Sequence, residues 1–334
     1  MPSPRYNTAF HSKDITEKSV LVTGGAGFIG SNLVEYLLKY KARKVRVLDN
    51  LSNGFMKNIE PFFSNPSFEF INGDITDTET CKKVCEGIHL ISHQAALGSV
   101  PRSVQFPLAT HAANATGFLN MLTAAKDARV EKFIYASSSS VYGDLKTSPK
   151  VEHTIGKALS PYAVSKFTNE LYAGVFSLNY GMKIIGLRYF NIYGPKQDPN
   201  GPYAAAIPLF MDALVNNKTA YINGDGEHSR DFTFVENAVQ ANVKALFCRN
   251  EDAFNKVYNV AVGDNISLNK LFVTLQELTG NNHKPVHREE RAGDIKHSQA
   301  DVSHAKKMLG YDPQIKLKDG LAITLQWFSE NLKK

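Results

Sequence analysis

The 334-residue chain has few cysteines, which limits the stabilisation and the chemistry open to it. Three cysteines cannot build a framework of disulfides. Cys81 and Cys85 share a helix face, but no further Cys or His stands near them at ligand spacing. We therefore expect buried thiols, no metal site, and a reduced, cytoplasmic setting.

Long apolar runs and dense clusters of like charge are also lacking. No apolar stretch approaches the roughly 18 residues that a membrane span needs. Residues 1–17 are polar and mixed in charge, unlike a secretory signal, and predict a short arm before the first strand. The formal net charge is +6, yet the basic residues are scattered rather than gathered in a stripe. A small anionic substrate suits this charge, and we expect no membrane or nucleic-acid partner.

What the chain does contain is a regular alternation of short apolar strands and amphipathic helices. The 43% hydrophobic content is enough for a sizeable core. Such alternation predicts an α/β fold built on a parallel, doubly wound sheet. The expected strands are 19–23, 45–48, 68–71, 88–91, 132–136 and 182–187, and the expected helices are 28–40, 76–86, 105–128, 160–179, 267–279 and 318–332.

The rhythm changes after Arg188, where proline and glycine become frequent and the loops lengthen. A chain of this length has room for one large domain and a smaller one. We therefore expect an arm at 1–17, a nucleotide-binding domain at 18–190, and a smaller, mainly substrate-binding α/β lobe at 191–334. Segments near 231–262 are expected to return to the first domain.

The pentapeptide Tyr162-Ala-Val-Ser-Lys166 is the most informative motif. Its phenol and ammonium lie four residues apart, on the same face of a helix. An ammonium stabilises a neighbouring phenolate, so we expect Lys166 to lower the Tyr162 pKa from its usual value of about 10. Tyr162 then becomes a usable general base near neutral pH. The alternative is an amphipathic helix that carries one Tyr and one Lys by chance.

A glycine-rich loop, Thr23-Gly-Gly-Ala-Gly-Phe-Ile-Gly30, follows the first strand and opens the first helix. Gly24 permits the tight turn, Gly27 lets backbone N–H groups approach a pyrophosphate, and Gly30 permits close packing of helix on strand. Asp49 stands 19 residues after Gly30, at a strand end. A carboxylate there bonds both ribose hydroxyls of NAD and repels the extra phosphate of NADP. The alternative role for Asp49 is a helix cap.

Two polar segments lie between the glycine loop and Tyr162. Asp74, in Gly73-Asp-Ile75, follows a strand and either contacts the adenine edge or caps the helix at 76–86. The serine run Ser137–Ser140 follows the strand expected at 132–136. Together these features describe a redox-cofactor site with a proton-transfer group attached.

The chain resembles the extended short-chain dehydrogenases/reductases, because its motifs occur in the order found in that family. Those motifs are the glycine loop at 23–30, Asp49-Asn50, Gly73-Asp74-Ile75, His93-Gln-Ala-Ala96, the Ser138 region with Val141-Tyr-Gly143, and Tyr162-x-x-x-Lys166. The motifs that narrow the resemblance to UDP-hexose 4-epimerases are Arg188-Tyr-Phe-Asn-Ile-Tyr-Gly-Pro195, Gly224-Asp-Gly226 with Ser229-Arg-Asp-Phe232, and Arg291-Ala-Gly-Asp294. Segment 93–102 is especially similar to the bacterial enzymes that epimerise UDP-N-acetylhexosamines. The resemblance covers about residues 18–330 and implies a Rossmann domain with bound NAD.

The resemblance implies an inversion at C4 with no net redox change. Tyr162 takes the proton from the sugar O4 while NAD⁺ accepts the C4 hydride. Lys166 holds the nicotinamide ribose, and Ser138 bonds O4 and relays the proton. The 4-keto sugar then rotates and takes the hydride back on its opposite face.

The same resemblance implies the residues of two binding sites. The implied cofactor site consists of Gly24, Gly27, Phe28, Ile29, Gly30, Asp49, Asn50, Asn53, Gly54, Asp74, Ile75, Gln94, Ala95, Asn114, Tyr162 and Lys166. The implied substrate site consists of Ser99, Ser138, Ser139, Asn191, Ala205, Arg230, Arg291, Asp294 and Ser298. Within it, Arg230 and Arg291 clamp the diphosphate, because guanidinium forks suit phosphate oxygens. A surface ion pair is the alternative for each arginine.

Substrate choice depends on the space around the sugar C2. Ser298, seven positions after Arg291, is small where a tyrosine marks the relatives restricted to UDP-glucose and UDP-galactose. Gly98 is small on the opposite side. Both leave room for an N-acetyl group, which predicts conversion of UDP-GlcNAc to UDP-GalNAc for surface polysaccharide synthesis. The alternatives are a UDP-glucose/UDP-galactose or UDP-N-acetylhexosaminuronate 4-epimerase, and a nucleotide-sugar dehydrogenase of the same fold.

Two other classes lack the residues they need. Dehydratases and decarboxylases of this fold carry a carboxylate beside the serine, and Ser138-Ser-Ser-Val141 offers none. Sensors that bind NAD without catalysis typically lose the Tyr or the Lys, and both are present. Related enzymes pair the helices near 105–128 and 160–179 across a two-fold axis, so we expect a homodimer through a four-helix bundle.

Overall fold

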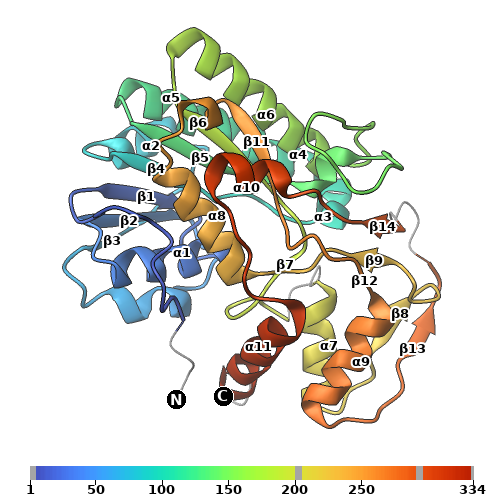
Figure 1. Ribbon diagram of the computed structural model, residues 1–334. Helices are drawn as coiled ribbons and strands as arrows, with labels where there is room; N and C mark the ends of the chain where they lie inside the picture. The colour runs from blue at the N-terminus through green and yellow to red at the C-terminus, as the bar shows by residue number, and fades with distance from the viewer. Residues whose placement is uncertain (1–4, 200–204, 291–295, 332–334) are drawn as a thin grey trace.

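The computed structural model describes residues 5–199, 205–290 and 296–331, and a parallel seven-stranded sheet lies at its centre (Figure 1). The strand order is β11-β6-β5-β4-β1-β2-β3, as in a doubly wound fold. This confirms the predicted fold class. The sheet strands are β1 Ser19–Thr23, β2 Lys44–Asp49, β3 Phe68–Asn72, β4 Leu90–His93, β5 Lys132–Ser138, β6 Ile184–Tyr189 and β11 Lys256–Val260. The strands predicted at 88–91 and 182–187 lie two residues further on.

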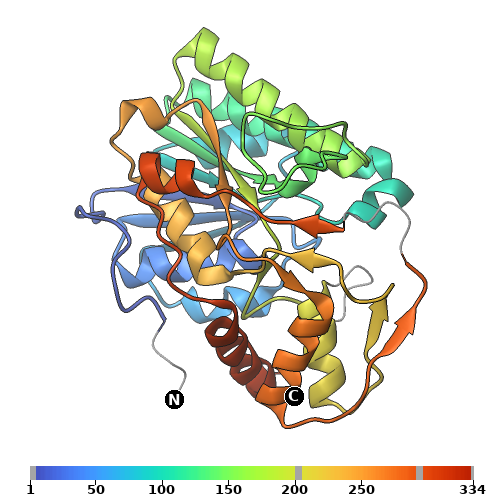
Figure 2. The same ribbon diagram turned by 45° about the vertical axis from the view of Figure 1, so that its right-hand side comes forward.

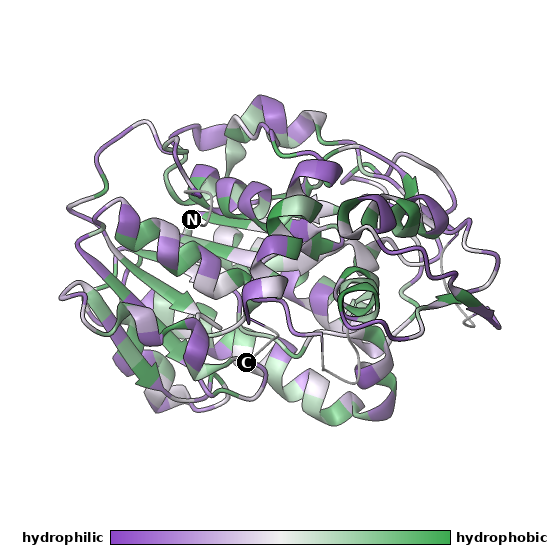
Figure 3. Ribbon diagram, turned by 90° about the horizontal axis from the view of Figure 1, so that it is seen from below, coloured by the Kyte–Doolittle hydropathy of each residue, from purple (hydrophilic) through white to green (hydrophobic). Residues whose placement is uncertain are grey.

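Helices cover both faces of this sheet, so its strands are apolar on both sides. Along β1, Val20 and Val22 pack in one hydrophobic cluster and Leu21 in the other, as the two-residue period of a strand requires. Figure 3 shows the strands as largely hydrophobic and the helices as two-sided. The helices on one face are α1 Phe28–Lys39 and α8 Val235–Leu246, and those on the other are α2 Thr78–Cys85, α5 Gly117–Asp127 and α6 Pro161–Tyr180.

The helix expected at 105–128 is confirmed from Pro107 to Asp127, where α4 (Pro107–His111), a π-helical turn η3 (Ala112–Thr116) and α5 follow one another without a break. A short helix, α3 (Val100–Gln105), precedes it and was not predicted. Phe106 leaves helical geometry at φ −129° and ψ 65°, because the residue before a proline is pushed toward extended backbone. Pro107 then starts α4 at a position where its missing N–H costs nothing.

The second lobe has its own core at one end of the sheet (Figure 2). Three helices pack together there, and both helices expected in this region, 267–279 and 318–332, are present as α9 and α11. The helices α7, α8 and α10 and the strand β11 were not predicted from the sequence. The remaining elements are α7 Ala206–Val215, α9 Leu268–Thr279, α10 Ser303–Leu309, α11 Leu317–Asn331, β7 Ile192–Tyr193, β8 Tyr221–Asn223, β9 Ser229–Arg230, β10 Thr233–Phe234, β12 Ile266–Ser267, β13 Val286–Arg288, β14 His297–Ser298, and the 3-10 turns η1 Met56–Asn58, η2 Glu60–Phe62, η4 Ser139–Tyr142 and η5 Glu251–Ala253.

The chain returns to the sheet after entering the second lobe. β11 pairs in parallel with β6, from Lys256 opposite Ile185 to Val260 opposite Tyr189. α8 packs against α1 and against β4, β5 and β6. The exact division of the chain into domains stays a prediction.

The arm before β1 lies against α1 rather than extending away from it. Tyr6 is 1% exposed, and its carbonyl accepts a hydrogen bond from the Tyr40 hydroxyl at 2.9 Å. Phe10 stacks on Tyr36 with ring centroids 5.1 Å apart. Arg5 forms an ion pair with Glu35 of α1 at 2.5 Å.

Within the described ranges, no helix is long and apolar enough to cross a bilayer.

Candidate active site

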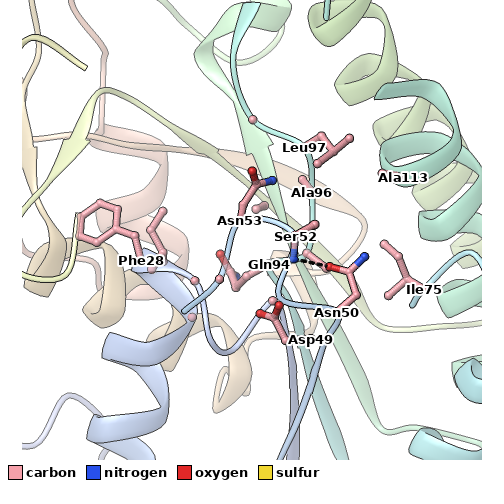
Figure 4. Close-up of a pocket in the computed structure, with 18 of the residues that line it drawn as sticks. Phe28, Asp49, Asn50, Ser52, Asn53, Ile75, Gln94, Ala96, Leu97 and Ala113 are labelled. Carbon is pink, nitrogen blue, oxygen red and sulfur yellow. Dashed lines mark hydrogen bonds between the residues drawn. The ribbon is translucent and has the colours of Figure 1, made fainter. Parts of the chain in front are cut away.

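A cavity of about 440 Å³ lies at the carboxyl ends of the sheet strands, where α/β proteins bind nucleotides. Side chains from β2, the loop after it and the segment after β4 point into it (Figure 4). The predicted cofactor residues that line it are Gly24, Gly27, Phe28, Ile29, Gly30, Asp49, Asn50, Asn53, Gly54, Asp74, Ile75, Gln94, Ala95, Tyr162 and Lys166.

The glycine loop has the close approaches that a dinucleotide cradle needs. A Cβ on Gly24, which has φ +69°, would lie 2.6 Å from the Ala95 nitrogen. A Cβ on Gly30 would lie 2.1 Å from the Gly24 oxygen. Gly27 is the N-cap of α1 and has no side chain to cap the first turn, and that turn, from Gly27 to Gly30, lines the cavity. Such an N-terminus suits an anionic pyrophosphate.

Asp49 closes β2 and is 7% exposed. Its two carboxylate oxygens accept hydrogen bonds from the N–H groups of Ala26 at 2.9 Å and Leu51 at 2.8 Å. Burial raises the Asp49 pKa, and these backbone donors oppose the rise. Asp49 caps no helix in the described chain, which removes the alternative considered for it.

Asp74 also lines the cavity instead of capping a helix. Asp77 caps α2, accepting from the N–H groups of Glu79 and Thr80, so the capping interpretation of Asp74 is wrong. Asp74 accepts a hydrogen bond from the Asn50 amide at 2.7 Å and from the Thr76 N–H at 2.8 Å. The cradle, the buried Asp49 carboxylate and this polar edge fit NAD.

The proton-transfer residues meet where α6 passes the end of β5. Tyr162, Lys166 and Ser138 all line the cavity, and Ser138 lies close enough to the Tyr162 hydroxyl to lower the Tyr162 pKa. The Lys166 ammonium is 3% exposed and donates to the Ala136 carbonyl at 2.8 Å. It lies 6.0 Å from the centroid of the Tyr162 ring.

The expected lowering of the Tyr162 pKa by Lys166 is wrong for this arrangement. Burial raises the pKa of Tyr162, and the hydrogen bond with Ser138 is what opposes the rise. Lys166 directs its ammonium at a backbone carbonyl rather than at the phenol. Burial lowers the Lys166 pKa to about 8, and Glu170 opposes that shift.

Several predicted residues lie outside the cavity wall. Asn114 is buried, and its amide binds the Leu97 backbone and the Ser165 hydroxyl. Ser99 caps α3 through the Arg102 N–H. Ser139 starts the η4 turn next to Ser138. These three support the wall from behind or beside it.

The other predicted substrate residues lie in the second lobe, and of those that the structure describes only Asn191 lines the cavity, whereas Ala205, Arg230 and Ser298 do not. Asn191 lines the cavity at φ +39° and donates to the Asp231 carbonyl at 3.2 Å. Arg230 and Ser298 are opposite each other on the paired strands β9 and β14, and Ala205 is the exposed N-cap of α7. Arg291 and Asp294 lie outside the described residues.

Some residues that line the cavity were not predicted from the sequence. Ser52, Leu97, Ala113, Ser137 and Tyr189 line it. Tyr189 stands in a motif that had been quoted, and its hydroxyl donates to the Gln94 side chain at 3.0 Å. The motif position was the available signal for Tyr189, whereas Ala113 has none that a single sequence reveals.

Comparison with known proteins identifies the family. The model of the NAD dependent epimerase/dehydratase family matches residues 20–261. The chain belongs to this family. It is 35% identical to the UDP-glucose 4-epimerase of Mycolicibacterium smegmatis over 310 residues, covering 92% of this chain and 97% of that protein.

Two solved structures extend the comparison. The UDP-N-acetylglucosamine 4-epimerase from Methanobrevibacter ruminantium M1, in complex with UDP-N-acetylmuramic acid, is 38% identical with a TM-score of 0.89, over 94% of this chain and 99% of that one. The UDP-glucuronic acid 4-epimerase from Bacillus cereus, with UDP-glucuronic acid and NAD, is 31% identical with a TM-score of 0.86, over 93% and 99%. NAD is the cofactor of this epimerase.

Replacing Tyr162 by Phe removes only the phenolic oxygen and should lower turnover by about 10²–10⁴-fold while NAD stays bound. Turnover and bound NAD are measured on the same preparation. Tyr180→Phe, at the exposed end of the same helix, is the matched control. Activity of Tyr162→Phe within a few-fold of wild type would exclude Tyr162 as the base.

Replacing Asp49 by Ala should reduce the NAD that copurifies with the enzyme and weaken its discrimination against NADP. The reason is that the ribose hydroxyl bonds and the repulsion of a 2′-phosphate both come from this carboxylate. Cofactor content and the binding of both nucleotides give the measurement, with surface Asp127→Ala as control. Unchanged retention of NAD by Asp49→Ala contradicts the assignment.

Proposed function

We propose that the protein interconverts UDP-GlcNAc and UDP-GalNAc in the cytoplasm, as a supply for surface polysaccharide synthesis. Membership of the family and its relatives establish the coarser activity: the protein is an NAD-dependent UDP-sugar 4-epimerase. The N-acetyl preference, the location and the pathway are the proposal.

The residues on the cavity wall supply a route for the proton. NAD held by the glycine loop and Asp49 would supply the hydride acceptor for C4. The Tyr162 hydroxyl takes the proton from O4, and Ser138, which lies beside it, orients O4 and shares that proton. Lys166, which also lines the cavity, would hold the nicotinamide ribose.

The observation that carries the N-acetyl preference is the space beside Gly98. Gly98 lines the cavity, and a Cβ built on it would meet no atom within 4 Å. The protein's own packing therefore does not require a glycine here, and the space is available to a sugar substituent. Ser298 provides a small side chain next to Arg230, on the strand pair of the substrate lobe. The Methanobrevibacter relative, named for UDP-N-acetylglucosamine, supports the same preference.

Two relatives are named for other UDP-sugars. The Mycolicibacterium enzyme is named for UDP-glucose and the Bacillus enzyme for UDP-glucuronic acid. A panel of UDP-sugars, assayed without added cofactor and with C4 of each product identified, tests the proposal. Conversion of UDP-GlcNAc faster than of UDP-glucose and uronate sugars supports it. A preference for either of the others overturns it, and release of NADH indicates a dehydrogenase.

We also propose a homodimer formed through α6 and the neighbouring α4. Val164, Leu171, Val175 and Leu178 recur at spacings of seven, four and three along α6, and each is at least half exposed. Leu108 on α4 is 85% exposed. An apolar stripe of this kind on a well-packed helix pair is typical of a face that a second copy covers.

Replacing Ser298 by Tyr should abolish conversion of the N-acetylated pair and spare any conversion between UDP-glucose and UDP-galactose. A phenol ring overfills a packed wall at a cost of about 1–3 kcal/mol or more, and the C2 hydroxyl is too small to meet it. Both sugar pairs are assayed, with exposed Ser303→Tyr as control. Equal loss on both pairs would mean general damage, and no loss on either would mean that Ser298 does not face the sugar.

Replacing Val175 by Glu should convert the dimer to a monomer, because it buries a carboxylate in the centre of the apolar stripe. Sedimentation velocity gives the mass in solution. Val273→Glu on α9 is the control, since Val273 is also exposed but lies on the other lobe. If the wild type is a monomer, or if Val175→Glu remains a dimer, the proposed dimer interface on α6 and α4 is wrong.

A further inference from the structure

Three residues of α6 contact the last three residues of β5. Tyr162, Lys166 and Glu170 follow one another at intervals of four and so share a helix face. Tyr162 lies beside Ser138, Lys166 donates to the Ala136 carbonyl at 2.8 Å, and Glu170 accepts from the Ser137 hydroxyl at 2.5 Å. Two of these contacts belong to the proposed chemistry, and the third has no role in it.

The Glu170 carboxylate, which makes the third contact, is also bound by Arg188 of β6. Arg188 donates from Nε and Nη2 to the two Glu170 oxygens, at 2.9 and 2.7 Å. The side chains are 3% and 7% exposed, respectively. Ser137 stands opposite Arg188 in the pairing of β5 with β6, so both strands and the helix meet at one carboxylate. A bidentate pair of this kind fixes an orientation as well as a charge.

Glu170 also acts on Lys166, one helical turn away. Burial lowers the pKa of Lys166 to about 8, and the Glu170 charge opposes that shift. The other titratable groups that face Lys166 are Tyr162 on its own helix and His93 of β4. Burial holds the pKa of His93 near 3, so His93 is neutral at working pH and Glu170 is the nearby anion.

We propose that Glu170 is a positioning residue of this active site, which fixes Ser137 beside the Ser138–Tyr162 pair and keeps Lys166 protonated. The proposal rests on the proposed epimerase function for its rate measurements. Arg188 serves it by orienting the carboxylate. The simpler alternative is a buried ion pair that only holds the sheet and α6 together.

The variant Ser137→Ala distinguishes these alternatives. It removes the hydrogen bond between Glu170 and β5 and leaves the Glu170–Arg188 ion pair intact. We expect a fall in kcat of about tenfold from the displaced Ser138, with KM within twofold and bound NAD unchanged. Ser140→Ala, in the same run and outside the cavity wall, is the control. A kcat for Ser137→Ala within twofold of wild type overturns the positioning role.

Glu170→Gln tests the effect on Lys166. Without the anion the Lys166 pKa falls further, so Lys166 loses its proton at a lower pH than in the wild type. The alkaline limb of the kcat profile should move down by about one pH unit. Competitive acetylation of Lys166, followed by mass spectrometry, should show the same shift without any turnover. An unmoved limb and an unmoved acetylation profile overturn the charge role.

Two further outcomes are also decisive. Should Glu170→Gln fail to fold because Arg188 is left as an unpaired buried charge, Ser137→Ala, which leaves the ion pair intact, still decides the positioning role. If the wild type converts no UDP-sugar, the proposed function fails, and acetylation of Lys166 still decides whether Glu170 controls its charge.

Discussion

The active site depends on how closely backbone segments approach at the carboxyl edge of the sheet. Gly24 lies against the backbone of Ala95, and Gly30 lies against the carbonyl of Gly24. A Cβ on Gly54 would lie 2.9 Å from the Asp49 carboxylate. These contacts draw the first turn of α1, the end of β2 and the segment after β4 around a single cavity. Any side chain at these glycines would push apart the elements that carry the polar groups.

Enclosure of the cavity governs its electrostatics. Burial raises the pKa values of Asp49 and Tyr162 and lowers that of Lys166, so each shift opposes the charged form. The protein responds with directed partners: backbone N–H groups for Asp49, a carbonyl for Lys166, and a serine hydroxyl for Tyr162. A desolvated site strengthens each of these interactions, which is the condition under which positioned groups act on a transition state.

The sequence was informative wherever a local pattern dictates structure. Apolar strands followed by a glycine loop or a serine run predicted the sheet, and the four-residue spacing of Tyr162 and Lys166 predicted their shared face. α8 was missed because buried amides interrupt its apolar pattern; Asn237 and Asn242, for example, bond Ile315 and Tyr189. The Ser137–Glu170–Arg188 contacts link residues far apart in the chain, and no local signal marks them. The Tyr162 pKa was predicted in the wrong direction because spacing does not reveal where an ammonium points.

Glu35 joins three parts of the molecule at one carboxylate. It lies on α1, pairs with Arg5 of the arm, and pairs with Lys196 at 3.0 Å in the segment after β7. Beside it the arm covers the aromatic rings of Tyr36 and Tyr40. A chain begun at the first strand would leave those rings as an exposed apolar patch and Lys196 with one neighbour fewer in its network. The arm is thus an integral layer of the fold beside α1, and its removal would lower the solubility of the protein.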